Sequence, residues 1–234
     1  MLFISPPFGN YISLPYTKSI KGSYTLEPRT GLFSQILKTF RYSFKYNGWV
    51  NKIGLRNKGL AYGITHYNPQ RDILSIAILN QNEIPKIIDM LPENTNIELN
   101  ISCPNVNKSL AHNGLSDFIN SKRDWCIIKL SPTTDMKLVH NYYKQGFRQF
   151  HCSNTIPVKE GGLSGLAIIP YTSTLISLIK SKYSDVEVIS GGGIYDWEQL
   201  NNYKKIGADH FSISTIFLKP LNLSMFFFNF YSNL

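Results

Sequence analysis

The chain has 234 residues, 43% of them hydrophobic, three cysteines and a formal net charge of +9. This length suits one domain with a core of its own, and the sequence holds no run of the roughly 20 apolar residues that span a bilayer. The cysteines are isolated and form no C-x-x-C pair, which argues against a disulfide framework or a zinc site and predicts a reducing, cytoplasmic location.

The positive charge is concentrated in one stretch of the chain. Between Lys18 and Lys58, nine basic residues stand against one acidic residue. A block of this sign attracts an anionic small molecule, a nucleic acid or an acidic protein, because all three respond to the same long-range field. Most basic surfaces are only solvated, so specific nucleic-acid binding is the less favoured interpretation.

Short β-rich runs and helical patterns alternate along most of the chain. The runs predict strands near residues 10–14, 20–25, 73–79, 97–102, 125–130, 149–153, 186–190 and 210–214. Helical periodicity falls between the later runs, at 83–91, 135–145, 170–182, 196–206 and from 217 onward.

This alternation implies parallel strands with right-handed crossovers, and eight strands predict one closed (β/α)8 TIM barrel spanning 1–234 as a single domain. A doubly wound sheet is the alternative, but its glycine fingerprint after the first strand is missing. The segment 29–67 breaks the alternation and is long enough to form a lid or an extra cap over the site.

The predicted strand ends carry the candidate chemical groups. Asn100 and Cys103 lie where one strand ends before Pro104. Lys129 interrupts an apolar strand, so it either pairs with an anion or extends its charged end into solvent. Asn154 and its neighbouring hydroxyls offer polar groups at another strand tip, although ordinary turn capping uses the same residue types.

Two glycine runs follow the sixth and seventh predicted strands, at 161–165 and 190–194, and the pair Ser214 and Thr215 follows the eighth. Glycine exposes backbone N–H groups without Cβ obstruction, as a phosphate requires, and barrel enzymes commonly hold phosphate at these loops. The second run leads into a helix at Asp196, so we expect the helix end to assist.

Nine segments together resemble the dihydroorotate dehydrogenases, flavin-dependent barrel enzymes of pyrimidine synthesis. In family order they are TLEPR at 25–29 with Gly31, NKIGL at 51–55 with Asn57 and Gly59, SIA at 75–77, NISCPNV at 100–106, KL at 129–130, SNT at 153–155, GGLSG at 161–165, GGI at 192–194 and ST at 214–215. The SCPN and NKIGL segments are highly specific, whereas the glycine runs recur in many phosphate-binding barrels. The resemblance extends over most of the chain.

The resemblance implies a site for dihydroorotate and for FMN. It assigns substrate binding to Asn51, Gly54, Leu55, Asn100, Asn105, Asn154 and Thr155. It assigns FMN binding to Ser23, Asn100, Lys129, Gly165, Gly192, Gly193, Ser214 and Thr215, with Lys129 at the N1/O2 edge of the flavin ring. Asparagine suits a pyrimidine dione because its amide both donates and accepts hydrogen bonds.

The resemblance also implies that Cys103 removes a proton from substrate C5 while a hydride passes from C6 to flavin N5, giving orotate. A free thiol has a pKa of about 8.5, so a nearby positive charge or a dry, closed site helps it act near neutral pH. A cysteine chosen at random is more often a small buried hydrophobe, which is what we expect of Cys126 and Cys152.

A cysteine base is typical of the soluble relatives. These are often homodimers, and they pass electrons to fumarate or, through a separate iron–sulfur flavoprotein, to NAD. A homodimer is therefore compatible with the resemblance, whereas membrane association is not expected.

The chain departs from the family in its first strand–helix unit, which is compressed. The lysine that soluble relatives carry before the serine of strand two is replaced by Gly22, and Lys21 is adjacent. A shift of one residue reverses the face of a strand, so Lys21 cannot simply take over the role. Two alternatives stay open, a dihydrouridine synthase-like flavoenzyme acting on tRNA and a degenerate barrel that binds flavin without turnover.

Overall fold

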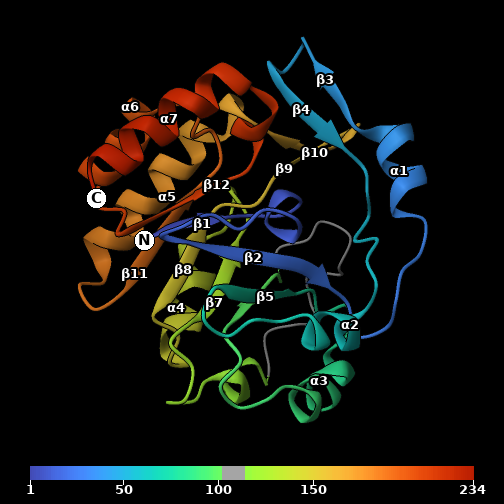
Figure 1. Cartoon of the computed structure of the whole chain (residues 1–234). Coiled ribbons are helices and arrows are strands. Elements are labelled where there is room, and N and C mark those ends of the chain that lie inside the picture. The colour runs from blue at the N-terminus through green and yellow to red at the C-terminus, as the bar shows by residue number, and fades with distance from the viewer. Residues whose placement is uncertain (102–113) are drawn as a thin grey trace.

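The computed structural model describes residues 1–101 and 114–234, and at its centre eight parallel strands form a closed barrel (Figure 1). Around the barrel the strands are β1 (Leu2–Ile4), β2 (Thr17–Tyr24), β5 (Asp72–Ile76), β6 (Ile97–Leu99), β7 (Cys126–Leu130), β8 (Gln149–Cys152), β11 (Glu187–Gly191) and β12 (His210–Ile213). Strand β12 then pairs with β1 and closes the ring. The predicted (β/α)8 barrel is confirmed.

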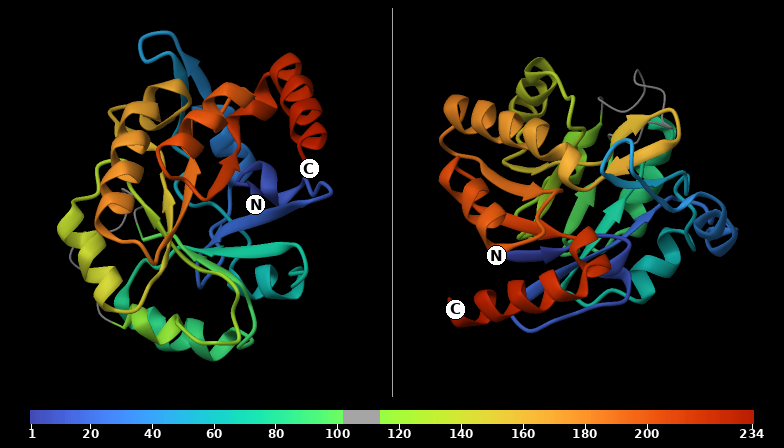
Figure 2. Two further views of the ribbon diagram at one scale, coloured as in Figure 1. Left: turned by 90° about the vertical axis from the view of Figure 1, so that its left-hand side faces the viewer. Right: turned by 90° about the horizontal axis from the view of Figure 1, so that it is seen from above.

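Helices surround the barrel, as both views in Figure 2 show. They include α3 (Ile84–Met90), α4 (Met136–Lys144), α5 (Ile169–Lys182), α6 (Trp197–Lys205) and α7 (Pro220–Ser232), which match the predicted helical segments. Short 3-10 turns, η2 (Gln81–Glu83) and η3 (Leu115–Phe118), lie beside α3 and before β7. None of the helices that the structure describes is both long enough and apolar enough to cross a bilayer.

The first strand lies earlier in the chain than we predicted. Residues 10–14 form no strand, and Tyr11 is 79% exposed, whereas Phe3 and Ile4 of β1 are fully buried. The 3-10 helix η1 (Phe8–Asn10) follows, and the Asn10 side chain accepts a hydrogen bond from the backbone N–H of Gly22 at 2.7 Å. This turn leads into β2 without an intervening α-helix. The expected compression of the first unit is therefore present, but the strand that precedes it is residues 2–4 and not residues 10–14.

The C-terminal helix covers the compressed unit. Phe8 in η1 stacks on Phe217 with ring centroids 5.1 Å apart, and Phe217 in turn meets Phe227 of α7 at 6.4 Å. Figure 2 shows α7 alongside the N-terminal strand. Burying aromatic surface in this way supplies the packing that a helix between β1 and β2 would otherwise provide.

The barrel interior has an apolar layer with a polar layer above it. The apolar layer is a cluster of Phe3, Ile20, Ile73, Trp125, Ile127 and Ile189. Side chains two residues apart on a strand share a face. The next inward positions are therefore polar or small, namely Ser5, Ser75, Lys129 and Gly191. The core thus ends, and the polar site begins, partway along the strands.

A second, small sheet covers the carboxyl ends of the barrel strands. The segment 29–67 contributes α1 (Leu32–Thr39), β3 (Arg41–Ser43), β4 (Gly48–Asn51) and α2 (Leu60–Thr65), and the loop after β8 contributes β9 (Ile156–Val158) and β10 (Gly161–Ser164). These strands pair in the order β3-β4-β10-β9, all antiparallel (Figure 1). The predicted cap is therefore present, and it is joined to the barrel by the hairpin after β8.

Candidate active site

Two adjoining cavities lie at the carboxyl ends of the barrel strands. Their volumes are about 220 Å³ and 490 Å³. They share a wall made of Pro6, Pro7, Ile36, Asn51, Ile53, Lys129, Asn154 and Thr155. Barrel enzymes carry their active sites at this end of the fold. We therefore treat the two cavities as parts of one site.

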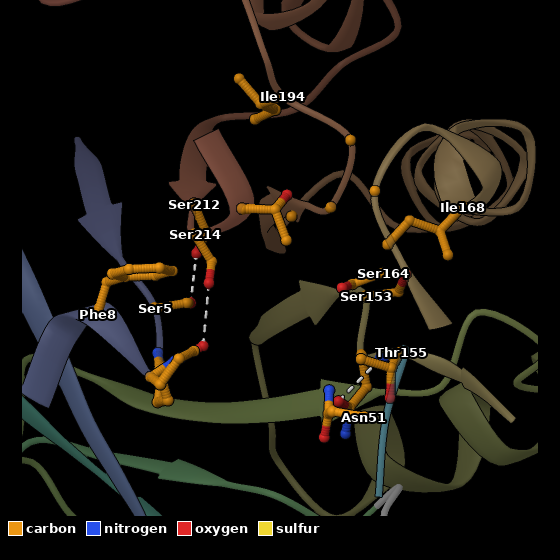
Figure 3. A pocket seen from close by; sticks show the side chains of 18 of the residues that line it. Ser5, Phe8, Asn51, Ser153, Thr155, Ser164, Ile168, Ile194, Ser212 and Ser214 are labelled. Carbon is orange, nitrogen blue, oxygen red and sulfur yellow. Dashed lines mark hydrogen bonds between the residues drawn. The ribbon is translucent and has the colours of Figure 1, made fainter. Parts of the chain in front are cut away.

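The smaller cavity is lined by both glycine loops and by the Ser-Thr pair. The predicted phosphate residues Gly165, Gly192, Gly193, Ser214 and Thr215 all face it. A Cβ on Gly192 would lie 2.0 Å from the side chain of Ile168, so only glycine permits the two loops to approach this closely. Figure 3 shows Ser5, Ser212 and Ser214 on one side of this pocket and Ser153, Ser164 and Ile168 on the other.

Two short 3-10 helices begin at this cavity, η4 (Leu166–Ile168) and η5 (Thr215–Leu218), and no side chain in the described part of the chain caps the start of either. The first N–H groups of a helix have no partner within it, so they suit an anion. Helix α6 differs, because the Asp196 carboxylate accepts the backbone N–H of Gln199 at 2.7 Å. A carboxylate therefore occupies the start of this helix, and its assistance to a phosphate stays a prediction.

A buried carboxylate, Glu98, lies beneath the cavities and contacts three of the described side chains. Its Oε1 is 3.2 Å from the Lys129 ammonium and accepts the Ser75 hydroxyl at 2.8 Å, while its Oε2 lies 2.5 Å from Nδ1 of His151. Burial alone would raise the pKa of Glu98, but Lys129 and His151 outweigh it and hold that pKa well below its usual value. Glu98 is therefore the anion that Lys129 needs.

Sequence reasoning missed both Glu98 and His151. Each interrupts an otherwise apolar strand, as Lys129 does, and that was the available signal. Their pairing follows from register, since β7 aligns Lys129 with His151 and β6 aligns Glu98 with Ile127. Burial, followed by the charge of Lys129, lowers the pKa of His151, so its imidazole is neutral near pH 7.

A chain of hydrogen bonds leads from Glu98 to the predicted substrate residues. The Ser75 hydroxyl lies 2.8 Å from that of Ser23, which accepts the Asn100 amide at 2.8 Å. The Asn154 amide donates to Asn100 Oδ1 at 3.0 Å. The fold thus brings Ser23, Asn100 and Asn154 together with Lys129, from four strands that are distant in sequence.

The larger cavity has a basic wall. The segment 51–58 contributes the predicted residues Asn51, Gly54 and Leu55 together with Lys52, Arg56 and Lys58, and Lys159 lies on the β9–β10 turn. Among the described residues that line this cavity, none is acidic. This wall accounts for part of the basic block in the sequence and suits an anionic ligand.

Asn57 fixes the shape of that wall. Leu55 has a left-handed backbone with φ of +56°, a conformation that is uncommon for a residue with a side chain. The Asn57 amide donates to the Leu55 carbonyl at 2.7 Å, and its oxygen accepts the Gly59 N–H at 2.8 Å. Gly54 and Leu55 are therefore held with their backbone at the cavity.

Lys21 does not reach the site. Its ammonium lies 2.7 Å from the fully buried carboxylate of Asp72, on the face of β2 opposite to the barrel interior. It lines neither cavity. Lys21 is therefore a structural residue, and it does not replace the lysine that Gly22 displaces.

Cys103 and Asn105, the predicted base and one predicted substrate ligand, lie outside the described residues. The other two cysteines are described. Burial raises the pKa of the Cys126 thiol to about 12 and raises that of Cys152 as well. Neither lines a cavity, in keeping with the structural role that we expected of them.

Comparisons with known proteins agree with the geometry. No protein-family model matches the chain. The catalytic subunit of dihydroorotate dehydrogenase B (NAD(+)) from Phocaeicola vulgatus is 30% identical over 208 residues, covering 74% of this chain and 68% of the relative. The corresponding subunit from Oceanobacillus iheyensis is 27% identical over 242 residues, covering 89% of this chain and 79% of the relative.

A solved structure shares the fold. The dihydroorotate dehydrogenase of Eimeria tenella, crystallised with ferulenol, superposes with a TM-score of 0.70 over 96% of this chain and 78% of that one. The sequences are 15% identical, so this likeness speaks for the fold alone.

Proposed function

The chain belongs to the dihydroorotate dehydrogenase family, and we propose that it is an FMN-dependent enzyme that oxidises (S)-dihydroorotate to orotate in pyrimidine (UMP) synthesis. The observation that carries the proposal is the meeting of Lys129, Asn100 and Asn154 at one barrel mouth, beside a glycine-lined cavity. The compressed first unit lines this mouth as well, through Pro6 and Pro7 on the wall that the two cavities share.

The residues present fit FMN. Gly165, Gly192 and Gly193 bring backbone N–H groups to the smaller cavity, and the Thr215 hydroxyl lines it too, a donor set that suits the phosphate. The Ser214 hydroxyl donates to the Pro6 carbonyl at 3.1 Å and would have to release it to join this set. Lys129 and Ser23 line the larger cavity next to it, where the ring would lie. When bound, FMN supplies the acceptor for the hydride that leaves C6 of the substrate.

Asparagine side chains would hold the substrate. Asn51, Asn100 and Asn154 share one cavity, Thr155 adjoins them, and Asn105 completes the proposed set. Each amide can donate to one edge of a pyrimidine dione and accept from another. The backbone of Gly54 and Leu55 lines the same space, and Arg56 is the cation best suited to the carboxylate of dihydroorotate, since its guanidinium can bind it with two hydrogen bonds.

Cys103 is the proposed base. Its thiolate would take the proton from C5, and the electron pair of that C–H bond would form the C5=C6 double bond as the hydride departs from C6. The Glu98, Lys129 and His151 group sums to zero charge when His151 is neutral, so the described residues place no negative charge at the cavity to oppose the thiolate.

Two assays test this proposal together. The purified chain should carry FMN, released by denaturation and identified by chromatography, and it should form orotate from dihydroorotate with an artificial electron acceptor. Dihydrouracil, which lacks the carboxylate, is the matched control and should react far more slowly.

The same assays separate the two alternatives. Orotate formation would exclude the degenerate barrel. Bound FMN without orotate formation, together with tight, salt-sensitive binding of tRNA, would favour the dihydrouridine synthase-like alternative. A cytoplasmic location and a homodimer stay predictions.

A further inference from the structure

Three buried ionisable side chains, Glu98, Lys129 and His151, lie beneath the cavities. The proposed reaction does not itself require the central one, Glu98. We propose that Glu98 is a positioning residue, which holds Lys129 against the flavin and cancels enough of its charge to set how strongly the site favours reduced FMN. The inference rests on the proposed function, because it concerns the same flavin site.

Glu98 is held in one orientation. The carboxylate is fully buried, Oε1 receives Lys129 and Ser75, and Oε2 receives His151. A carboxylate with partners on both oxygens cannot turn without leaving one of them unsatisfied in the interior. Glu98 is therefore a rigid anchor.

Lys129 is held by this anchor and still faces the ligand. It is almost fully buried, yet it lines both cavities. Among the described residues, its hydrogen bond to Glu98 uses one of the three N–H donors of the ammonium, and the other two can reach a ligand. Glu98 thus fixes the position of the long, flexible lysine side chain, and the remaining N–H donors of its ammonium are available to a ligand in the cavities.

The charges of this set cancel. His151 is neutral near pH 7, so its Nδ1–H donates to Glu98, and Nε2 faces Gly191, where an added Cβ would lie only 2.4 Å away. One positive and one negative charge remain. A reduced flavin carries more negative charge than an oxidised one, so removing the carboxylate charge should favour the reduced form.

The protein contains a matched control for Glu98. Asp72, on the neighbouring strand β5, is also fully buried and also pairs with a lysine, Lys21, at 2.7 Å. It lines neither cavity. A role in folding alone predicts the same result for the two carboxylates, whereas a role at the flavin predicts different results.

The test compares Glu98→Gln with Asp72→Asn by measuring the dissociation constants of oxidised and reduced FMN, which also give the shift in midpoint potential. Glu98→Gln should raise the preference for reduced FMN about tenfold, because an uncompensated charge stays beside the ring. Asp72→Asn should lower the melting temperature and leave the preference within about twofold of the parent. Equal preferences in the two variants would overturn the inference.

A second variant covers the case in which Glu98→Gln fails to fold, as judged by circular dichroism. Glu98→Asp keeps the charge but ends one methylene short of Lys129. It should lower the preference for reduced over oxidised FMN about tenfold, because the misplaced ammonium loses more of its attraction to the reduced flavin than to the oxidised one. A parental preference would contradict the role of Glu98. If the parent itself binds no FMN, the proposed function has failed, and that result is separate from either outcome.

Discussion

Two buried lysine–carboxylate pairs in neighbouring strands show how position decides the role of the same chemistry. Asp72 stands at the first residue of β5 and faces outward to Lys21, whereas Glu98 stands inside β6 and faces the interior and Lys129. Both carboxylates are fully buried. In a barrel of this kind, residues at the amino-terminal ends of the strands contribute to stability, and residues at the carboxyl ends form the active site.

The two pairs should therefore fail differently when broken. Removing one partner of a buried ion pair leaves an uncompensated charge and typically costs about 3–5 kcal/mol. At the outer pair, Lys21 and Asp72, that cost should appear in stability alone; the inner pair is Lys129 and Glu98. At the inner pair it should also appear in the binding and chemistry of the flavin.

The largest effect is expected at Cys103, which lies beyond the strand that carries Glu98. Cys103→Ala should retain FMN and slow its reduction by dihydroorotate about a thousandfold, because the C5 proton loses its acceptor. Rapid-mixing absorbance measurements would show this. Cys126→Ala, which changes a buried thiol, should reduce its flavin at the parental rate, and a parental rate in Cys103→Ala would remove that residue from the mechanism.

The next effect separates the two lysines directly. Lys129→Met should weaken FMN binding about a hundredfold, since it removes a contact to the ligand and leaves Glu98 uncompensated. Lys21→Met should leave FMN binding unchanged and lower the free energy of unfolding measured with urea. Fluorescence titration with FMN distinguishes them. Similar FMN affinities in the two variants would mean that the pair of Glu98 and Lys129 contributes no more to FMN binding than the pair of Asp72 and Lys21.

A smaller effect concerns the basic wall of the larger cavity. Arg56→Gln should raise the KM for dihydroorotate about tenfold with little change in kcat, as expected when a charged hydrogen bond to the bound substrate is lost. Lys58 lies over the ring of Tyr62, 4.3 Å from its centre, and Lys58→Gln is the control, with a smaller change in KM. Equal changes in the two variants would assign the recognition to the general field of the wall and not to Arg56.

The smallest effect is a pH dependence of stability. The folded pKa of His151 is lowered, so the unfolded chain binds the extra proton as pH falls below about 6.5, and stability is lost in that direction. The depressed pKa of Glu98 continues the loss below about pH 4.3. His151→Asn should flatten the dependence of the unfolding free energy between about pH 7 and pH 5, by at most about 1.4 kcal/mol per pH unit. A parental slope would contradict the assignment of a neutral, buried His151.

The fold was largely predictable because the alternation of strands and helices follows from local sequence patterns. The first strand was not, since β1 has only three residues, too few to show a period, while the residues around Tyr11 have the composition of a strand. The distinction between Lys21 and Lys129 was partly predictable from alternation of faces along each strand.

The partners of Lys129 were not predictable in the same way. The sequence left this lysine either an anionic partner or a position with its charged end in solvent. The choice of Glu98 depends on the register between β6 and β7, which no local pattern encodes. The same holds for the hydrogen bonds that join Ser23, Asn100 and Asn154. These contacts exist only once four strands have closed into one barrel.

The central claim is that the chain oxidises dihydroorotate at a bound flavin, and one measurement addresses it most directly. Dihydroorotate is added to the purified, FMN-loaded chain without oxygen, and the visible absorbance of the flavin is followed through a single turnover. We expect the flavin absorbance to bleach, with one orotate formed for each FMN. A flavin that keeps its absorbance in the presence of saturating dihydroorotate would contradict the account.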